Sequence, residues 1–189
     1  GDAICDVLFG DKVPSGKLTA TMPKSVGQIP LYYNHLNTGR PLKEGKWFSK
    51  FTSNYLDIDN DPLYPFGYGL SYTTFKYGKP TLSSNTMTNN ETISVSVDIT
   101  NTGNYDADEI AQMYIRDLAA SVSRPVKELK GFERISIKKG ETKTVTFTIT
   151  PEDLKFYNQE LEYKNEPGEF EVMVGPNSKD VQTLTFTLK

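Results

Sequence analysis

The sequence predicts a mainly β protein, in which an antiparallel β-sandwich follows a short α/β piece and a long irregular arm. From about Pro80 onward, short segments alternate strictly between apolar and polar residues, and turn residues separate them. Residues 24–63 have no sustained period of 2 or 3.6, and they are rich in Pro, Gly, Asn and Asp. We therefore expect three parts, which are residues 1–23, 24–79 and 80–189.

The first part begins with a predicted helix. Residues 2–9 place three apolar side chains at i, i+3 and i+4, and Gly10 is a plausible helix end. The apolar positions are Ile4, Val7 and Leu8. Residues 13–22 predict a short strand-like segment, closed by Pro23. One helix and one strand cannot enclose a core, so this piece either completes a domain whose remainder is missing or lies against the domain that follows.

The second part is predicted to be a connecting arm. A structureless connection of this length is uncommon in a compact domain, and an ordered one is often functional or an extended packing arm. Its last stretch, from Tyr64 to Gly78, is rich in aromatic residues and glycine but lacks the Gly-Lys-Ser/Thr of a phosphate loop. We therefore expect its aromatic residues to be packing anchors between the two flanking domains. These anchors are Tyr64, Phe66, Tyr68, Tyr72 and Phe75.

The third part predicts about seven short antiparallel strands over about 110 residues, a sandwich of the immunoglobulin or fibronectin type III kind. The strands fall in 91–100, 110–117, 126–142 (more than one strand, ending in a turn at Gly140), 143–150, 168–175 and 183–189. Residues 151–158 are expected to form a turn with one helical twist. In 110–117, alternation places Ala111, Met113 and Ile115 on the core face and Gln112 and Tyr114 on the other.

Composition excludes several classes of function. The net charge of −3 gives no basic surface for nucleic acid. The single cysteine, Cys5, rules out an internal disulfide, and no apolar run approaches the ~20 residues of a membrane span. His35 is the only histidine, so a zinc site is disfavoured, and a catalytic triad would lack its G-x-S-x-G elbow. The sequence calls for no cofactor.

One acidic pattern resembles the start of a calcium loop. Asp57, Asp59 and Asp61 are spaced as D-x-D-x-D, but the sixth position is Pro62 and the twelfth is Tyr68, where the loop needs glycine and glutamate. We interpret the pattern as a polar turn and expect no metal there.

Five long motifs span nearly the whole chain. They are "CDVLFGDKVPSGKLTATMP", "SVGQIPLYYNHLNTGRP", "PLYPFGYGLSYTTF", "SRPVKELKGFERI" and "PGEFEVMVGPNS". Together, and in this order, they resemble the C-terminal part of glycoside hydrolase family 3, in particular bacterial β-glucosidases of the periplasmic type.

The resemblance implies a parent enzyme with a barrel, an α/β-sandwich domain and a fibronectin type III-like domain. Residues 1–23 would be the end of the α/β domain. The family's nucleophilic aspartate and acid/base glutamate would both lie upstream, so no catalytic residue is expected in this chain. The parent would be a β-glucosidase hydrolysing O-glycosyl bonds. The expected partners are the missing domains and, through them, a β-glucoside substrate. The resemblance also implies a location in the periplasm or outside the cell.

Three residues of the arm are candidates for the rim of the parent's substrate pocket: His35, Arg40 and Trp47. An alternative reading makes the chain a carbohydrate-binding or adhesion-type β-sandwich, because aromatic faces stack on sugars. We also expect the isolated chain to expose an apolar patch around the arm and to dimerise through it. The sequence does not distinguish glucose from xylose specificity.

Overall fold

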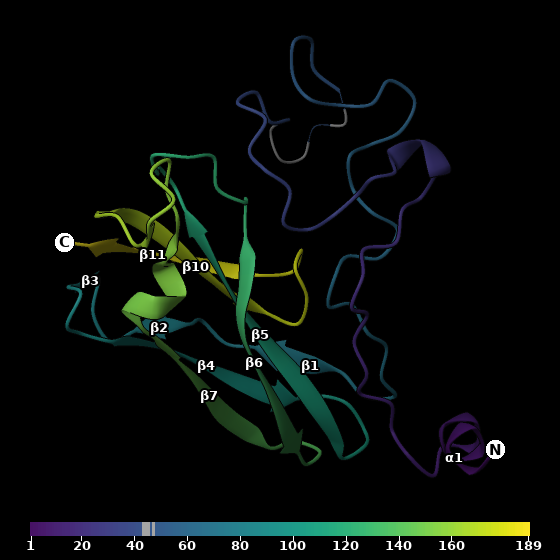
Figure 1. Ribbon diagram of the computed structural model, residues 1–189. Helices are drawn as coiled ribbons and strands as arrows, with labels where there is room; N and C mark the ends of the chain where they lie inside the picture. The colour runs from purple at the N-terminus through teal and green to yellow at the C-terminus, as the bar shows by residue number, and fades with distance from the viewer. Residues whose placement is uncertain (43–45, 47) are drawn as a thin grey trace.

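The computed structural model of the protein describes residues 1–42, 46 and 48–189. Two β-sheets face each other, and the arm runs beside them in purple and blue, with the N-terminal helix standing apart from the sandwich (Figure 1). Trp47 lies outside the described residues. No helix in the described ranges is long and apolar enough to cross a membrane.

Strand β4 is central to the first sheet, because it pairs antiparallel with β7 along one edge and with β1 and β2 along the other. This sheet comprises β1 (Phe75–Tyr77), β2 (Thr81–Leu82), β4 (Ile93–Asn101) and β7 (Thr142–Ile149). The second sheet has the order β3-β11-β10-β5-β6. It comprises β3 (Thr86–Met87), β5 (Ala107–Asp117), β6 (Glu128–Ile137), β10 (Gly168–Gly175) and β11 (Gln182–Leu188).

The predicted sandwich is confirmed, and its core lies between the two sheets. The alternating side chains of β4, β7, β10 and β11 point inward and are almost fully buried, for example Val95, Phe147 and Val172. The predicted turn at Gly140 is also confirmed, and its φ of 75° is a conformation that glycine adopts without strain. The expected helical twist after β7 is the 3₁₀ helix η2 (Pro151–Leu154), which leads into a small hairpin of β8 (Phe156–Tyr157) and β9 (Tyr163–Lys164).

Five strands were missed because they are only two or three residues long, and three of them, β1, β2 and β3, belong to the two large sheets. β1 and β2 together form an edge that Gly78 to Pro80 interrupts. The chain then crosses to the other sheet, where β3 pairs parallel with β11. Segments this short do not display a period, so their place is set by pairing with β4 and β11 rather than by local sequence.

The predicted helix is confirmed as α1 (Asp2–Phe9), and Gly10 ends it in the left-handed conformation. The predicted strand-like segment 13–22 is wrong as a regular strand. Met22 forms an isolated bridge with Tyr64, and Leu18 exchanges backbone hydrogen bonds with Gly67 and Tyr68. The facing run contains Pro65, which has no N–H to donate, so a continuous ladder cannot form.

The arm has little regular structure in its described part. It contains the 3₁₀ helix η1 (Val26–Gln28), which Ser25 caps together with Gln28, and an isolated bridge between Leu36 and Pro125. Gln28 is fully buried, and its amide donates to the carbonyl oxygens of Asp59 and Asp61. Side-chain hydrogen bonds to the backbone therefore take the place of secondary structure in the arm.

Candidate functional site

Strand β5 is buried on both faces, which differs from the alternation that its sequence predicts. Ala111, Met113 and Ile115 face the core as expected, but Gln112 is only 3% exposed and Tyr114 is fully buried. Gln112 and Tyr114 do lie on the face opposite these three residues, but alternation alone did not show that this face is covered as well. The arm covers that face of β5, where it contacts Gln112 and Tyr114.

Gln112 is the centre of a hydrogen-bond network between the sandwich and the arm. Its Nε2 donates to the carbonyl oxygens of Gly67, at 3.1 Å, and Pro176, at 2.7 Å, and its Oε1 accepts from the hydroxyl of Tyr114. Gly67 has a φ of 78°, and a Cβ at this position would lie 2.0 Å from Gln112 Oε1. Only glycine therefore allows this approach of the arm backbone to β5.

Aromatic stacking adds a second anchor beside this network. The ring of Tyr33 stacks on Phe66 with a centroid distance of 4.2 Å and meets Tyr114 edge-on at 5.8 Å. Its hydroxyl accepts from the backbone N–H of Leu129 on β6, at 3.3 Å. Two parts of the arm that are distant in sequence are thus held on one patch of the second sheet.

A largely buried ion pair fixes the segment that precedes the arm. Lys17 Nζ lies 3.1 Å from Glu109 Oε1, and the two side chains are 14% and 6% exposed. The hydroxyl of Tyr77 on β1 donates to the same carboxylate at 2.9 Å. Burial, followed by the negative charge of Glu109, raises the pKa of Tyr77 well above its usual range, so the hydroxyl stays protonated and remains a donor.

The five aromatic residues expected to be packing anchors divide into two groups in the structure. Phe66 packs under Tyr33, and Phe75 packs against the sandwich core. Tyr64 and Tyr68 stack on each other at 5.0 Å, and Tyr72 donates to the carbonyl oxygen of Val7 in α1 at 2.6 Å. Tyr64 and Tyr72 remain 41% and 46% exposed, so these two rings keep surface that the described chain does not cover.

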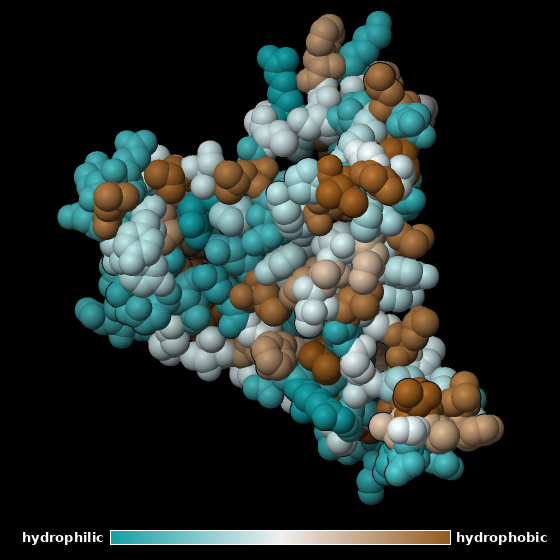
Figure 2. Space-filling model, turned by 45° about the vertical axis from the view of Figure 1, so that its right-hand side comes forward, coloured by the Kyte–Doolittle hydropathy of each residue, from teal (hydrophilic) through white to brown (hydrophobic). Residues whose placement is uncertain are grey.

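Tyr64 and Tyr68 line an apolar groove with a volume of about 680 Å³. Its other apolar side chains are Leu18, Met22, Pro23, Leu63 and Leu70. In α1, Ile4, Leu8 and Phe9 are each at least 70% exposed, and none of the residues of this helix is buried. Figure 2 shows hydrophobic side chains gathered in the lower lobe that holds α1 and along the face above it. An apolar face of this extent marks an interaction surface.

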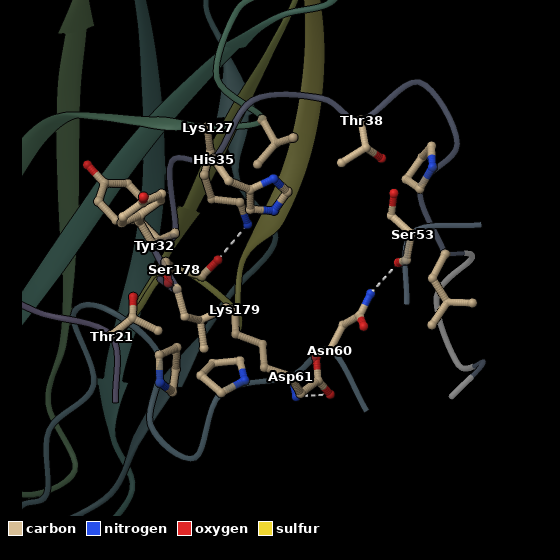
Figure 3. Close-up of a pocket in the computed structure, with 17 residues that line it drawn as sticks. Thr21, Tyr32, His35, Thr38, Ser53, Asn60, Asp61, Lys127, Ser178 and Lys179 are labelled. Atoms are coloured by element: carbon tan, nitrogen blue, oxygen red, sulfur yellow. Dashed lines mark hydrogen bonds and ion pairs between the residues drawn. The ribbon is translucent and has the colours of Figure 1, made fainter. Parts of the chain in front are cut away.

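A separate cavity of about 360 Å³, the arm pocket, lies where the arm meets the loops of the sandwich (Figure 3). The arm supplies Tyr32, His35, Thr38, Ser53, Asn60 and Asp61, and the sandwich supplies Lys127, Ser178 and Lys179. Asp61 is the only carboxylate among the described lining residues, and it is ion-paired with Lys179 at 2.8 Å. Glycoside hydrolysis needs two carboxyl groups, so the described lining does not supply that chemistry.

The three candidate rim residues differ in their position relative to the arm pocket. His35 lines the arm pocket, and its Nδ1 lies 3.0 Å from the carbonyl oxygen of Leu36. Arg40 is exposed and does not line this pocket, although its carbonyl oxygen accepts from Ser53 N–H. Trp47 falls outside the described residues, and of the other two only His35 lines the arm pocket.

The acidic turn is held by lysines. Lys24 Nζ lies 2.7 Å from Asp59 Oδ1, and this contact lowers the pKa of Asp59. Asp61 pairs with Lys179, which comes from the loop between β10 and β11. In the described part of the chain, no cluster of three or more His, Cys, Asp or Glu residues has the arrangement of a metal site.

Sequence reasoning missed Gln112, which holds the arm, and the pair of Lys17 and Glu109, which holds the segment before it. It also missed Lys127 in the lining of the arm pocket. Polar side chains at single positions carry no periodic signal of their partners. The one available signal was Tyr114, two residues after Gln112, because a large aromatic residue on the strand face away from the core indicates that something covers that face.

Two protein-family models match the chain, one in its N-terminal part and one in the sandwich. Residues 1–72 match the model described as "Glycosyl hydrolase family 3 C-terminal domain", and residues 109–178 match the "Fibronectin type III-like domain". The periplasmic β-glucosidase of Salmonella typhimurium is 56% identical over 188 residues, which is 100% of this chain and 24% of that protein. A β-xylosidase of Formosa agariphila is 47% identical over 100% of this chain and 25% of its own length.

Solved structures agree with these matches. The β-glucosidase of Listeria innocua in complex with gluconolactone superimposes with a TM-score of 0.92 at 45% identity, over 100% of this chain and 26% of that one. The β-D-glucoside glucohydrolase of Trichoderma reesei superimposes with a TM-score of 0.73 at 32% identity. The chain spans about a quarter of the length of the relatives that it matches.

Proposed function

The chain belongs to glycoside hydrolase family 3, as its C-terminal region, and from that premise we propose that it is the non-catalytic packing region of a β-glucosidase. The observation that carries this proposal is the apolar surface formed by α1 and the groove at Tyr64, which the described chain leaves open. The same segment matches the C-terminal domain model of the family.

The proposed role has two halves. Residues 1–23 and the groove pack against the catalytic domains, and the sandwich of residues 80–189 acts as a rigid buttress. Residues 24–79 join the two, because Gln112 and Tyr33 fix the arm to the sandwich, and Lys17 fixes the segment before the arm. A surface held in one geometry loses less entropy when it docks than a mobile one does.

Substrate and location follow from the relatives as proposals. The β-glucosidase relatives, and the periplasmic one among them, favour a β-glucoside substrate and a place in the periplasm or outside the cell. The β-xylosidase relative at 47% identity makes xylose the competing sugar. The residues that would select between them are expected outside residues 1–189, so the choice requires assays of the whole enzyme.

The first test is an activity assay of the isolated chain. We expect no hydrolysis of an aryl β-glucoside above the level of a mock purification from the same host. Isothermal titration with cello-oligosaccharides should also give no heat, which separates the packing role from that of a carbohydrate-binding module. Turnover that copurifies with the chain and disappears on its removal contradicts the proposal.

The second test is a chimera. In the Listeria chimera, this chain replaces the matched quarter of the Listeria innocua β-glucosidase, with which it shares 45% identity. We expect a soluble protein that hydrolyses the aryl β-glucoside. Substituting Arg40 by Ala in the chimera asks whether the arm reaches the substrate, because a rim contact would change KM or kcat and a remote residue would change neither.

A further inference from the structure

Lys127 is a half-buried cation without a carboxylate partner. Its Nζ donates to the carbonyl oxygen of Ser178 at 2.6 Å, and this is its one hydrogen bond within the described ranges. An ammonium group has three donors, so two of them have no protein partner among the described residues. No described carboxylate lies within ion-pair distance of Lys127. Figure 3 shows this side chain entering the arm pocket beside His35.

The charged side chains around Lys127 are paired with one another and not with Lys127. Lys179 also lines the pocket, but Asp61 neutralises it at 2.8 Å. Arg116 lies close enough to act on Lys127, and its own partner is Glu171, at 3.5 Å. Burial first, and Arg116 next, lower the pKa of Lys127, while Glu171 opposes them. A desolvated cation in this position is stabilised by an incoming anion.

The rest of the pocket suits a small ligand with both polar and apolar surface. Tyr32, Thr38 and Ser53 bring hydroxyl groups to the lining, and Leu31 and Val126 form part of its apolar wall. The cavity of about 360 Å³ falls at the lower end of the range of about 300–1,000 Å³ that is typical of small-molecule sites. Arm and sandwich each contribute one side, so the pocket exists only when the arm is docked.

We propose that the arm pocket binds a carboxylate and that Lys127 is its ion-pair partner. This inference goes beyond the packing role and does not depend on it. The carboxylate has two possible sources, which share this chemistry. It is either a free acidic ligand such as a sugar acid, or an Asp or Glu side chain of the longer polypeptide.

The test on the unmodified chain compares two sugars that differ in charge. Glucuronate carries a carboxylate at the position where glucose carries a hydroxymethyl group. We expect glucuronate to shift the amide NMR signals of Ser178 and His35 in a saturable manner, and glucose to bind at least about tenfold more weakly, as loss of a charged hydrogen bond predicts. Equal binding of the two sugars, or binding of neither, overturns the proposal.

Two variants identify the cation. Lys127→Met keeps an unbranched apolar stem as far as Cε but lacks the ammonium group, so it should lower the affinity for glucuronate about tenfold or more, since the charge-assisted contact is removed. Lys12→Met is the matched control, because Lys12 is exposed and outside the pocket, and it should bind as the unmodified chain does. An unchanged affinity in Lys127→Met contradicts the assignment, and circular dichroism establishes that the variant is folded.

The Listeria chimera distinguishes the sources. If the ligand is free, both the isolated chain and the chimera bind glucuronate. If a side chain of the longer polypeptide fills the pocket, the isolated chain binds glucuronate and the chimera does not, because its pocket is already occupied. Both outcomes support a carboxylate site, whereas glucuronate binding that survives Lys127→Met refutes it even when the chimera is fully active.

Discussion

The side-chain amide of Gln112 donates to the backbone carbonyl of Gly67 at 3.1 Å, which joins β5 of the second sheet to the arm across 45 residues of sequence. The approach is possible because Gly67 has no side chain and adopts a φ of 78°. We therefore expect Gly67→Ala to destabilise the chain by about 1–2 kcal/mol from the left-handed backbone, and by about 1–3 kcal/mol more from the clash with Gln112.

Urea unfolding measures this effect, and Gly140→Ala is its control. Gly140 has a similar φ of 75° but no atom within 4 Å of its would-be Cβ. It should therefore lose only the backbone contribution. Equal losses in the two variants would show that the contact between arm and β5 contributes nothing to stability.

Tyr33→Ala tests the aromatic anchor. Removing this ring leaves Phe66 and Tyr114 without their shared neighbour, so we expect a loss of about 2–4 kcal/mol in unfolding free energy. Amide hydrogen exchange in the arm should accelerate at the same time. The adjacent Tyr32→Ala is the control, since Tyr32 is 54% exposed and should change stability by less than about 0.5 kcal/mol.

Lys17→Met tests the buried ion pair. The carboxylate of Glu109 would keep only the hydroxyl of Tyr77, and removing one partner of a buried pair typically costs about 3–5 kcal/mol. The double variant Lys17→Met with Glu109→Gln should recover part of this loss, because no charge is then left buried. Urea unfolding measures these stabilities. Unchanged stability of Lys17→Met would contradict the account, because it would show that water compensates the charge of Glu109.

The exposed apolar surface predicts self-association of the isolated chain. We expect light scattering to show dimers or larger species as concentration rises. Leu8→Lys in α1 combined with Leu70→Lys in the groove should restore the monomer. Leu161→Lys, at an 80% exposed position on the β8–β9 hairpin, should leave association unchanged. A monomer at high concentration without any substitution contradicts this expectation.

How far the sequence predicts the structure depends on the range over which each signal acts. Alternation along β4, β7 and β10 correctly identified core strands, because every second residue meets the same environment. The helix ending at Gly10 was equally readable, since its signals are local. β1, β2 and β3 could not be predicted in this way, because their positions are set by pairing with β4 and β11, which are distant in sequence or carry no local signal of the pairing.

The candidate site was less predictable than the fold. The sequence showed an arm and its aromatic anchors, but the covered face of β5 comes from Gln112 and Tyr114, whose partners lie elsewhere in the chain. Lys127 illustrates the same limit. Its place in a cavity depends on Ser178 and on the arm, and nothing next to it in sequence reveals the missing carboxylate.

The central claim, a packing region without chemistry of its own, is tested most directly by kcat/KM of the Listeria chimera on an aryl β-glucoside. The companion measurements are the parent enzyme and the parent truncated before the matched quarter. The account predicts a chimera within about tenfold of the parent and a truncated protein that is insoluble or inactive. A truncated protein with the parent's activity and thermal stability would contradict it.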